Sequence, residues 1–354
     1  MRTDAKTTSG AGLTAVQRQR AVGSVVAAAA GDALGAPYEF QPPVPDVEEI
    51  DMIGGGVLDW QPGEWTDDTA MAIVVLEASL AASDGHDLRV DTAQDHIARE
   101  WYSWSLGTPD IGTLTSQVVR TAADLAREDG HYAPRAKDFR AAADTAHEQL
   151  PASAGNGSLM RAHVTVLPYL LSPVADAVEA ITAVCRLTHV HPDTIEANIL
   201  WGLSVRHAIL TGEIDARVGL DQLPEDRRGL WLERIEEAEQ ATPAMFRRNG
   251  WVVGAFQAAW AAISSVSPIP EGKFAQRDAM VVALRGAVRA GYDTDTVACI
   301  TGALMGAALG PKAVLPEWRR MLFGWPSYEV EELRGLVERV IAPMVHEDGE
   351  GNRS

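Results

Sequence analysis

The chain has 354 residues, with 30 basic and 49 acidic side chains and a net charge of −19. This length is enough to bury a large core. The negative charge opposes binding to a polyanion, so we expect no bulk nucleic-acid partner. The two cysteines, Cys185 and Cys299, lie in apolar stretches and are expected to be small buried side chains rather than a disulfide. The apolar run at 21–30 is too short to span a membrane and no signal peptide is evident, which favours the cytoplasm.

Helical periodicity extends over almost the whole chain, with apolar residues three or four positions apart. It predicts helices at residues 17–30, 69–82, 92–104, 115–127, 135–149, 174–187, 192–211, 224–241, 251–263, 274–289, 294–309 and 330–342. Convincing alternating strands are absent from the sequence pattern. We therefore predict an all-α fold with one compact domain at 15–345 and disordered tails at 1–14 and 346–354.

Glycines occur in two of these segments and are expected to have different roles in them. In the helix at 294–309 and just beyond it, glycines recur at every fourth position, as Gly302, Gly306 and Gly310. One face of this helix nearly lacks side chains, so we expect another backbone to approach it closely in the core. After the first helix, Gly31 and Gly35 are interpreted as helix breakers, with Asp32 as a structural hydrogen-bonding residue.

Two short acidic runs lie far apart in the chain, each at the start of a predicted helix. They are Trp65-Thr66-Asp67-Asp68-Thr69 and Gly291-Tyr292-Asp293-Thr294-Asp295-Thr296. One acid or hydroxyl suffices for a helix cap, whereas each run carries two acids beside threonines. Oxygen donors in this number suit hard cations such as Mg²⁺, Mn²⁺ or Ca²⁺. The runs therefore predict a shared metal site, with Asp67 and Asp295 at solvent-facing helix starts.

Three further segments carry residues suited to a functional site. Residues 37–63 form the longest irregular stretch and contain Glu39. The small-residue turn at 155–158 could hold a phosphate on its backbone N–H groups, or could be an ordinary turn. His189 and His191 precede a helix without zinc-like partners nearby, so hydrogen bonding to a ligand or to the backbone is favoured over zinc.

An ordered set of six motifs links these segments. The motifs are Gly31-Asp32-x-x-Gly35, Trp65-Thr66-Asp67-Asp68-Thr69, Asp110-Ile111-Gly112-x-x-Thr115, Gly155-Asn156-Gly157-Ser158-Leu159-Met160-Arg161, Thr188-His189 and Asp293-Thr294-Asp295-Thr296. Together they resemble the ADP-ribosylglycohydrolase family, in particular bacterial members similar to dinitrogenase reductase-activating glycohydrolase. The resemblance covers residues 17–310.

The resemblance implies an orthogonal all-α domain with a two-magnesium centre in a cleft, where Mn²⁺ could replace Mg²⁺. The implied metal ligands are Thr66, Asp67, Asp68, Asp293, Asp295 and Thr296. The implied catalytic acids are Asp67, Asp68 and Asp295, with Glu39 as a ligand or gate on a loop and Asp110 on the leaving side. The implied substrate-binding residues are Gly155, Asn156, Gly157, Ser158, His189 and Tyr292. Tyr292 departs from the usual glycine and is expected to narrow the cleft or to stack on the substrate.

The implied activity is Mg²⁺-dependent hydrolysis of the glycosidic bond between ADP-ribose and an acceptor, with arginine first among the acceptors. Serine, O-acetyl-ADP-ribose and nucleobase-linked substrates remain open. So do a non-catalytic ADP-ribose-binding or immunity-type protein and a two-metal phosphohydrolase that attacks the pyrophosphate. One of the ten tryptophans could flank the adenine. The sequence leaves the oligomeric state open.

Overall fold

A computed structural model describes residues 12–82, 85–150 and 152–345. Within these ranges the chain folds into fourteen α-helices, and the only strands are the short antiparallel pair β1 (Phe323–Gly324) and β2 (Tyr328–Glu329). The predicted all-α class is confirmed. In the same ranges, no helix has the length and apolar character needed to cross a bilayer.

The helices follow the predicted periodicity closely. They are α1 (Ala15–Gly35), α2 (Asp67–Ala81), α3 (Asp91–Ser105), α4 (Thr113–Glu128), α5 (Ala136–Gln149), α6 (Ala162–Thr165), α7 (Val174–Cys185), α8 (Pro192–Thr211), α9 (Glu225–Glu239), α10 (Val252–Ser264), α11 (Lys273–Val288), α12 (Thr294–Leu309), α13 (Pro316–Met321) and α14 (Val330–Ile341). Each predicted helix has a counterpart. The sequence missed α6 and α13, which are too short to show a helical period.

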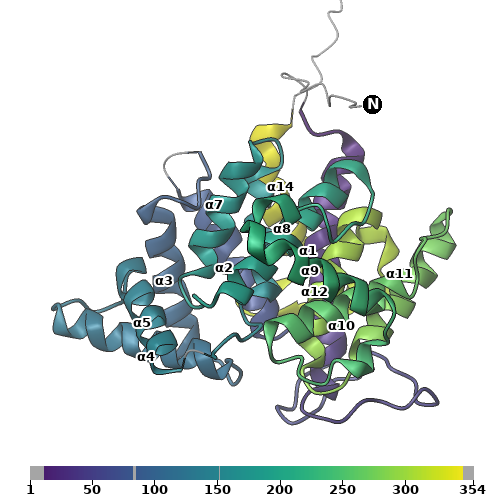
Figure 1. Cartoon of the computed structure of the whole chain (residues 1–354), viewed down its shortest axis with the longest axis horizontal. Helices are drawn as coiled ribbons and strands as arrows, with labels where there is room; N and C mark the ends of the chain where they lie inside the picture. The colour runs from purple at the N-terminus through teal and green to yellow at the C-terminus, as the bar shows by residue number, and fades with distance from the viewer. Residues whose placement is uncertain (1–11, 83–84, 151, 346–354) are drawn as a thin grey trace, which may run out of the picture.

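Helices α1 and α12 lie against each other at the centre of the molecule, with α3, α4 and α5 on one side and α10 and α11 on the other (Figure 1). A Cβ atom at Gly302 would lie 2.0 Å from the Ala27 carbonyl oxygen, and one at Gly306 would lie 2.1 Å from that of Gly23. The predicted close approach is therefore confirmed for these two glycines. Gly310 instead ends α12, with a φ of 77°.

Gly31 does not break α1, contrary to the sequence interpretation, and Gly35 is the last residue of α1 but keeps a right-handed helical backbone. Both face α12. A Cβ atom at Gly31 would lie 2.0 Å from the Ala298 carbonyl oxygen, and one at Gly35 would lie 2.4 Å from the Asp295 Cα. The lack of a side chain serves helix packing here rather than helix termination, because α1 and α12 touch backbone to backbone along their length.

The N-terminal boundary also differs from the expected tail at 1–14. Leu13 is buried and its N–H donates to the Met344 carbonyl, while the Thr14 side chain caps α1 by accepting from the Gln17 N–H. Leu13 and Thr14 therefore belong to the folded part of the chain. Residues 1–11 and the expected tail at 346–354 lie outside the described residues.

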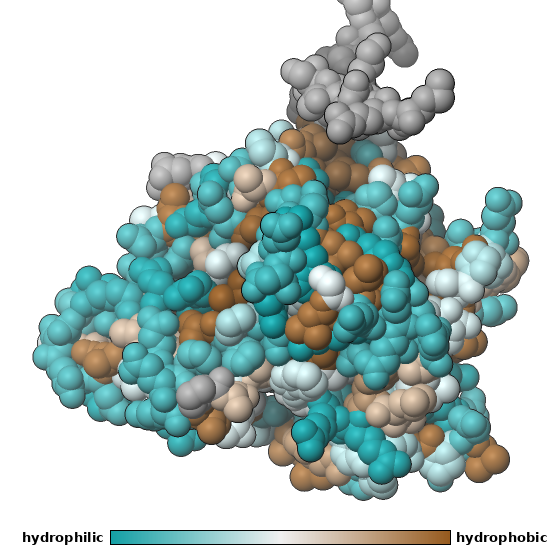
Figure 2. All heavy atoms as spheres, in the orientation of Figure 1, coloured by the Kyte–Doolittle hydropathy of each residue, from teal (hydrophilic) through white to brown (hydrophobic). Residues whose placement is uncertain are grey.

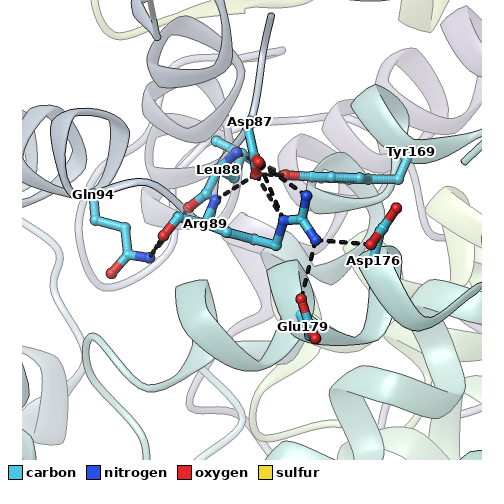
Figure 3. Close-up of polar contacts among 7 residues, drawn as sticks. All are labelled: Asp87, Leu88, Arg89, Gln94, Tyr169, Asp176 and Glu179. Carbon is cyan, nitrogen blue, oxygen red and sulfur yellow. Dashed lines mark hydrogen bonds and ion pairs between the residues drawn. The ribbon is translucent and has the colours of Figure 1, made fainter. Parts of the chain in front are cut away.

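An ion-pair cluster connects the segment before α3 to α7 (Figure 3). The Arg89 guanidinium lies 2.9 Å from Asp87 Oδ1, 2.8 Å from Asp176 Oδ1 and 3.0 Å from Glu179 Oε2. The Tyr169 hydroxyl donates to Asp87 Oδ1 at 2.7 Å. The bonds from Arg89 hold the pKa of Asp87 at about 2, below its usual range.

The molecular face in Figure 2 is mostly hydrophilic, with hydrophobic residues in scattered groups.

Candidate active site

The two acidic runs meet although they are more than two hundred residues apart. Thr66 directly precedes α2, and Asp293 directly precedes α12. The Thr66 Oγ1 atom lies 3.5 Å from Asp295 Oδ2, and the Thr296 Oγ1 atom lies 3.3 Å from Asp68 Oδ2. Two helix N-termini therefore point at one group of acids, an arrangement in which the helix dipoles favour negative charge.

Asp32 sets the start of α2 from the neighbouring α1. Its Oδ1 accepts from the Thr66 N–H at 2.9 Å, and its Oδ2 accepts from the Thr69 N–H at 3.0 Å and from the Thr69 hydroxyl at 2.6 Å. Asp32 is fully buried. The interpretation of Asp32 as a structural hydrogen-bonding residue is confirmed.

A cavity of about 870 Å³ opens beside this junction, within the size range typical of small-molecule sites. The acids that line it are Glu39, Asp67, Asp110, Asp193, Asp293 and Asp295. Its other walls come from the start of α4, the turn at 155–157 and the segment before α10, which contributes Arg248 and Trp251.

The acids at the junction of α2 and α12 include a compact group with unsatisfied oxygens. Glu39, Asp110 and Asp295 each offer a carboxylate oxygen, and these three atoms lie within 4.8 Å of one another. Glu39 Oε2, Asp110 Oδ2 and Asp68 Oδ1 are buried and have no hydrogen-bond partner among the described residues. A buried carboxylate without a partner is unfavourable, so this group fits an external cation.

The protonation of these acids reflects burial and mutual repulsion. Burial, with Asp32 and Asp293 adding to it, raises the pKa of Asp110 to about 6. Burial and then the neighbouring acids raise the pKa of Glu39 to about 10. The same two causes raise the pKa of Asp67, Asp68 and Asp295 well above the usual range. In the described part of the chain no basic side chain forms an ion pair with any of them.

The expectation that Asp67 and Asp295 lie at solvent-facing helix starts needs correction. Asp295 is 2% exposed, and Asp67 is only partly exposed, to the cavity. The reason is that α12 is a central helix, so its first turn lies inside the molecule. The burial strengthens the electrostatic interactions of these acids with any ion beside them.

Asn249 is a site residue that the sequence did not reveal. It is fully buried, its Oδ1 accepts from the Asp293 N–H at 3.3 Å, and its Nδ2 donates to the Gly291 carbonyl at 2.8 Å. The Asn156 amide donates to the Asn249 carbonyl at 2.8 Å and to Asp293 Oδ2 at 3.0 Å. Asn156 therefore holds Asp293 with its side chain.

The turn at 155–158 reaches the cavity through its first three residues, and the Ser158 hydroxyl does not face the cavity. Gly155, Asn156 and Gly157 line the cavity, whereas Ser158 does not. The Ser158 hydroxyl accepts from Asn198 Nδ2 at 2.8 Å and is buried. Among the described residues, the N–H groups of Gly157 and Ser158 have no hydrogen-bond acceptor.

His189 stands next to this turn. A Cβ atom at Gly155 would lie 3.4 Å from its Nε2, and one at Gly157 would lie 3.5 Å from its Cε1. Burial, aided by Arg161, lowers the pKa of His189 to about 3, so the imidazole is neutral at physiological pH. In the described residues the group with metal-ligand spacing contains carboxylates alone and does not include His189.

Tyr292 does not line the cavity, although it was expected to narrow the cleft or to stack on the substrate. Its N–H donates to the Gln41 carbonyl at 2.6 Å, and its carbonyl accepts from the Phe40 N–H at 2.7 Å. Tyr292 thus holds the loop that carries Glu39. The aromatic side chains that do line the cavity are Phe40 and Trp251, and both are partly open to solvent, with 59% and 38% of their surface exposed.

Comparisons with known proteins agree with this geometry. A profile of the ADP-ribosylglycohydrolase family matches residues 13–350. The chain is 28% identical to "ADP-ribosylarginine hydrolase Tri1" of Pseudomonas putida (strain GB-1), over 93% of this chain and 80% of that protein. It is 27% identical to "ADP-ribosyl-[dinitrogen reductase] glycohydrolase" of Rhodospirillum rubrum, over 91% of this chain and 96% of that protein.

A solved structure supports the same assignment. The fold matches an "ADP-ribosylglycohydrolase-related protein complex" with a TM-score of 0.68 and 26% sequence identity, covering 94% of this chain and all of the other. A profile match over nearly the whole length, a shared fold and an acid-lined cavity at the matching motifs point the same way: the chain belongs to the ADP-ribosylglycohydrolase family.

Proposed function

We propose that this protein is a Mg²⁺-dependent ADP-ribosyl glycohydrolase that cleaves the bond between ADP-ribose and the side chain of an arginine. The observation that carries the proposal is the group of buried acids centred on Glu39, Asp110 and Asp295, which no basic side chain among the described residues pairs with. The relatives from Pseudomonas and Serratia, which are named as ADP-ribosylarginine hydrolases, support arginine as the acceptor. The two free buried cysteines agree with a reducing, cytoplasmic location.

Two divalent ions would be held by the oxygens at the junction of α2 and α12. Their ligands would be Thr66, Asp67, Asp68, Asp293, Asp295 and Thr296, with Glu39 beside them. All donors are oxygen atoms, which Mg²⁺ prefers and Mn²⁺ accepts. When bound, such ions supply electrostatic stabilisation of the reacting ribose and make water a better nucleophile.

The protein residues then have to orient the sugar and move protons. In the reaction, a water oxygen bonds to the anomeric carbon, the bond from that carbon to the acceptor nitrogen breaks, and the acceptor keeps the electron pair. A carboxylate among Asp67, Asp68 and Asp295 takes the proton from water. Asp110, whose pKa lies at about 6, donates a proton to the leaving nitrogen.

The rest of the cavity is suited to the ADP part of the substrate. The N–H groups of Gly157 and Ser158, which have no acceptor in the described ranges, and the His189 imidazole offer donors for a diphosphate. Trp251 and Phe40 offer flat surfaces for the adenine or for the acceptor, with Trp251 on the wall that also carries Arg248.

The test is an end-point assay with purified protein, Mg²⁺ and peptides that carry ADP-ribose on arginine or on serine, with O-acetyl-ADP-ribose and a nucleobase-linked substrate in parallel. Chromatography should show free ADP-ribose from the arginine peptide. AMP plus ribose phosphate would indicate a pyrophosphate-cleaving enzyme instead, and tight ADP-ribose binding without turnover would indicate a binding protein. Asp176→Asn, which changes an acid in the Arg89 cluster, serves as a matched control and should retain activity.

A substitution in the turn tests the substrate pose. A Cβ atom at Gly157 would stand in ordinary contact with His189 and Thr115, but the two γ-methyl groups of valine would crowd the space beside them. Gly157→Val should therefore weaken ADP-ribose binding at least about tenfold, or 1.4 kcal/mol. Mg²⁺ affinity should be unchanged in calorimetry, and an equal loss of both affinities would show that the turn has only a structural role.

A further inference from the structure

A buried arginine lies directly behind the turn and His189. Arg161 is 1% exposed, and its guanidinium lies 4.4 Å from the centroid of the Trp101 ring. Within the described residues, no carboxylate pairs with it. Burial lowers the pKa of Arg161 only to about 10, so it carries a full positive charge at neutral pH. Such a charge is costly in the interior unless its donors are engaged.

Arg161 uses its two terminal nitrogens on two different elements. Nη1 donates to the Gly157 carbonyl, and Nη2 donates to the Thr188 hydroxyl. The Thr188 oxygen in turn lies 2.7 Å from His189 Nδ1. The guanidinium of Arg161 therefore connects the turn with His189. Arg161 itself does not line the cavity.

The bond to Thr188 favours one of the two neutral tautomers of His189. Arginine can only donate, so the Thr188 oxygen accepts from it and keeps its own proton to give. Among the described residues, the partner left for that proton is His189 Nδ1. A neutral imidazole that accepts at Nδ1 carries its hydrogen on Nε2. Nε2 is the atom beside Gly155 and Gly157 on the cavity wall.

The bond to Gly157 acts on a second donor. In a trans peptide the C=O and N–H bonds point in opposite directions. Because Arg161 holds the Gly157 carbonyl, the Ser158 N–H of the same peptide points away from the buried guanidinium. Ser158 itself does not line the cavity, so this N–H reaches a ligand past Gly157, which does line it. The charge of Arg161 also polarises this peptide, which strengthens its N–H as a donor.

We propose that Arg161 and Thr188 are positioning residues that fix two N–H donors, the His189 Nε2–H and the Ser158 backbone N–H, toward one phosphate group of the substrate. The inference deepens the proposed function and rests on it for the identity of the ligand. The positions of the two N–H donors are independent of the proposed function. Neither Arg161 nor Thr188 contacts the phosphate; each acts through the donor that it holds.

The first experiment tests the donors without any ligand. Two-dimensional ¹⁵N–¹H NMR of the imidazole rings, with His189→Gln to assign the signal, should show the Nε2–H tautomer in the wild-type protein. Thr188→Ser should keep this tautomer, because serine retains the hydroxyl. Thr188→Val should lose it or give a mixture. An Nδ1–H tautomer in the wild-type protein would overturn the inference, whatever the enzyme's substrate.

The second experiment measures the consequence for binding. Calorimetry with ADP-ribose should give an affinity about tenfold weaker for Thr188→Val, since the loss of one well-placed hydrogen bond lowers affinity by about this factor. The affinity of Thr188→Ser should be nearly unchanged. With the arginine-linked peptide the effect should fall on KM more than on kcat, and Mg²⁺ affinity should stay the same. Equal ADP-ribose affinity in the wild type and Thr188→Val would overturn the inference.

Arg161→Lys provides an independent variant. A lysine ammonium is a compact charge and does not span both acceptors as the planar guanidinium does. We expect ADP-ribose binding to weaken more than in Thr188→Val, because both donors lose their support. If Arg161→Lys fails to fold, the two Thr188 variants still decide the question. Failure of wild-type protein to bind ADP-ribose, with the Nε2–H tautomer present, would count against the proposed function and not against the arrangement of donors.

Discussion

Two groups of carboxylates in this molecule show opposite electrostatics. Around Arg89, the acids Asp87, Asp176 and Glu179 surround an internal cation, and the pKa of Asp87 falls to about 2 (Figure 3). At the junction of α2 and α12, the acids are more deeply buried and form no ion pair with a basic side chain in the described part of the chain, and their pKa values rise. Asp110, with a pKa raised to about 6, is an example.

The contrast indicates a structural role for the acids around Arg89 and a binding role for the acids in the cavity. The acids around Arg89 are already paired and join two parts of the fold. Those in the cavity are held close by helix starts and hydrogen bonds, although they repel one another. Not every acid of the cavity lacks a cation. Asp193, on a different wall, forms ion pairs with Arg227 and Arg234. An arrangement that maintains unpaired acids at one point is suited to receive a cation from solution.

Replacing a cavity acid should have the largest effect on activity. Asp295→Asn removes a charge that we assign to metal binding, so kcat should fall by at least about 1,000-fold, on the order of 4 kcal/mol. In EDTA the same variant should melt at a temperature equal to or above that of the wild type, because it removes a carboxyl whose ionised form burial and the neighbouring acids disfavour. Activity above a tenth of the wild-type value would contradict the assignment.

Adding the metal should give the cavity acids the cation that the acids around Arg89 already have, and should therefore stabilise the folded protein. Mg²⁺ at a hundred times its dissociation constant should stabilise the wild-type protein by about 2.7 kcal/mol through mass action. Urea denaturation with Mg²⁺, with Mn²⁺ and with EDTA measures this shift. The Asp295→Asn variant should respond much less, and absence of stabilisation in the wild type at millimolar metal would refute the metal site.

The metal-free protein should also show a characteristic pH dependence. The pKa of Asp110 is about 6 when folded and 3.8 ordinarily, so between these values the folded state binds its proton more tightly than the unfolded state does. Its stability should therefore fall as pH rises through this window, by up to about 1.4 kcal/mol per pH unit for each such group. Urea denaturation in EDTA between pH 4 and pH 7 tests this slope. Saturating Mg²⁺ should flatten the slope, and a metal-free protein that gains stability over this range would contradict the raised pKa values.

The paired group should respond in the opposite direction and less strongly. The pKa of Asp87 is lowered, so its contribution is present above its ordinary value and is lost as pH falls toward 2. Asp87→Asn should lower the free energy of unfolding by about 1–2 kcal/mol at neutral pH and leave activity intact. Asp124→Asn, at the exposed pair with Arg127, is the control and should change stability by less than about 0.5 kcal/mol. Equal effects of the two variants would show that the Arg89 cluster has no special role in stability.

The sequence predicted the helices well because their signals are local. Apolar residues at helical spacing recur within each segment, and the glycine series of α12 showed that another backbone approaches it. On α1, Gly31 and Gly35 were interpreted as helix breakers, although both face the backbone of α12. A glycine at a helix end and a glycine at a helix crossing look alike until the partner helix is known.

The site was predictable where the motif residues themselves meet, and less so where other segments support them. Asn249 holds Asp293 from a segment far away in sequence, and no local pattern marks it. Tyr292 was expected at the substrate, but a left-handed backbone conformation, with a φ of 61°, turns its peptide groups toward the loop at 40–41. Side-chain direction depends on tertiary packing, which a single sequence does not specify.

The backbone contact between α1 and α12 also bears on how this enzyme can change over evolutionary time. At Gly35 a single added methyl group would meet the backbone of Asp295, so the spacing of the acids is set by atoms that mutation can hardly adjust. Loss of function can therefore arise at a glycine that touches no ligand. At the glycines that line the cavity, a Cβ atom would lie 3.4 Å or more from its neighbours, so new acceptors can be acquired by varying these segments while the central pair of helices is inherited unchanged.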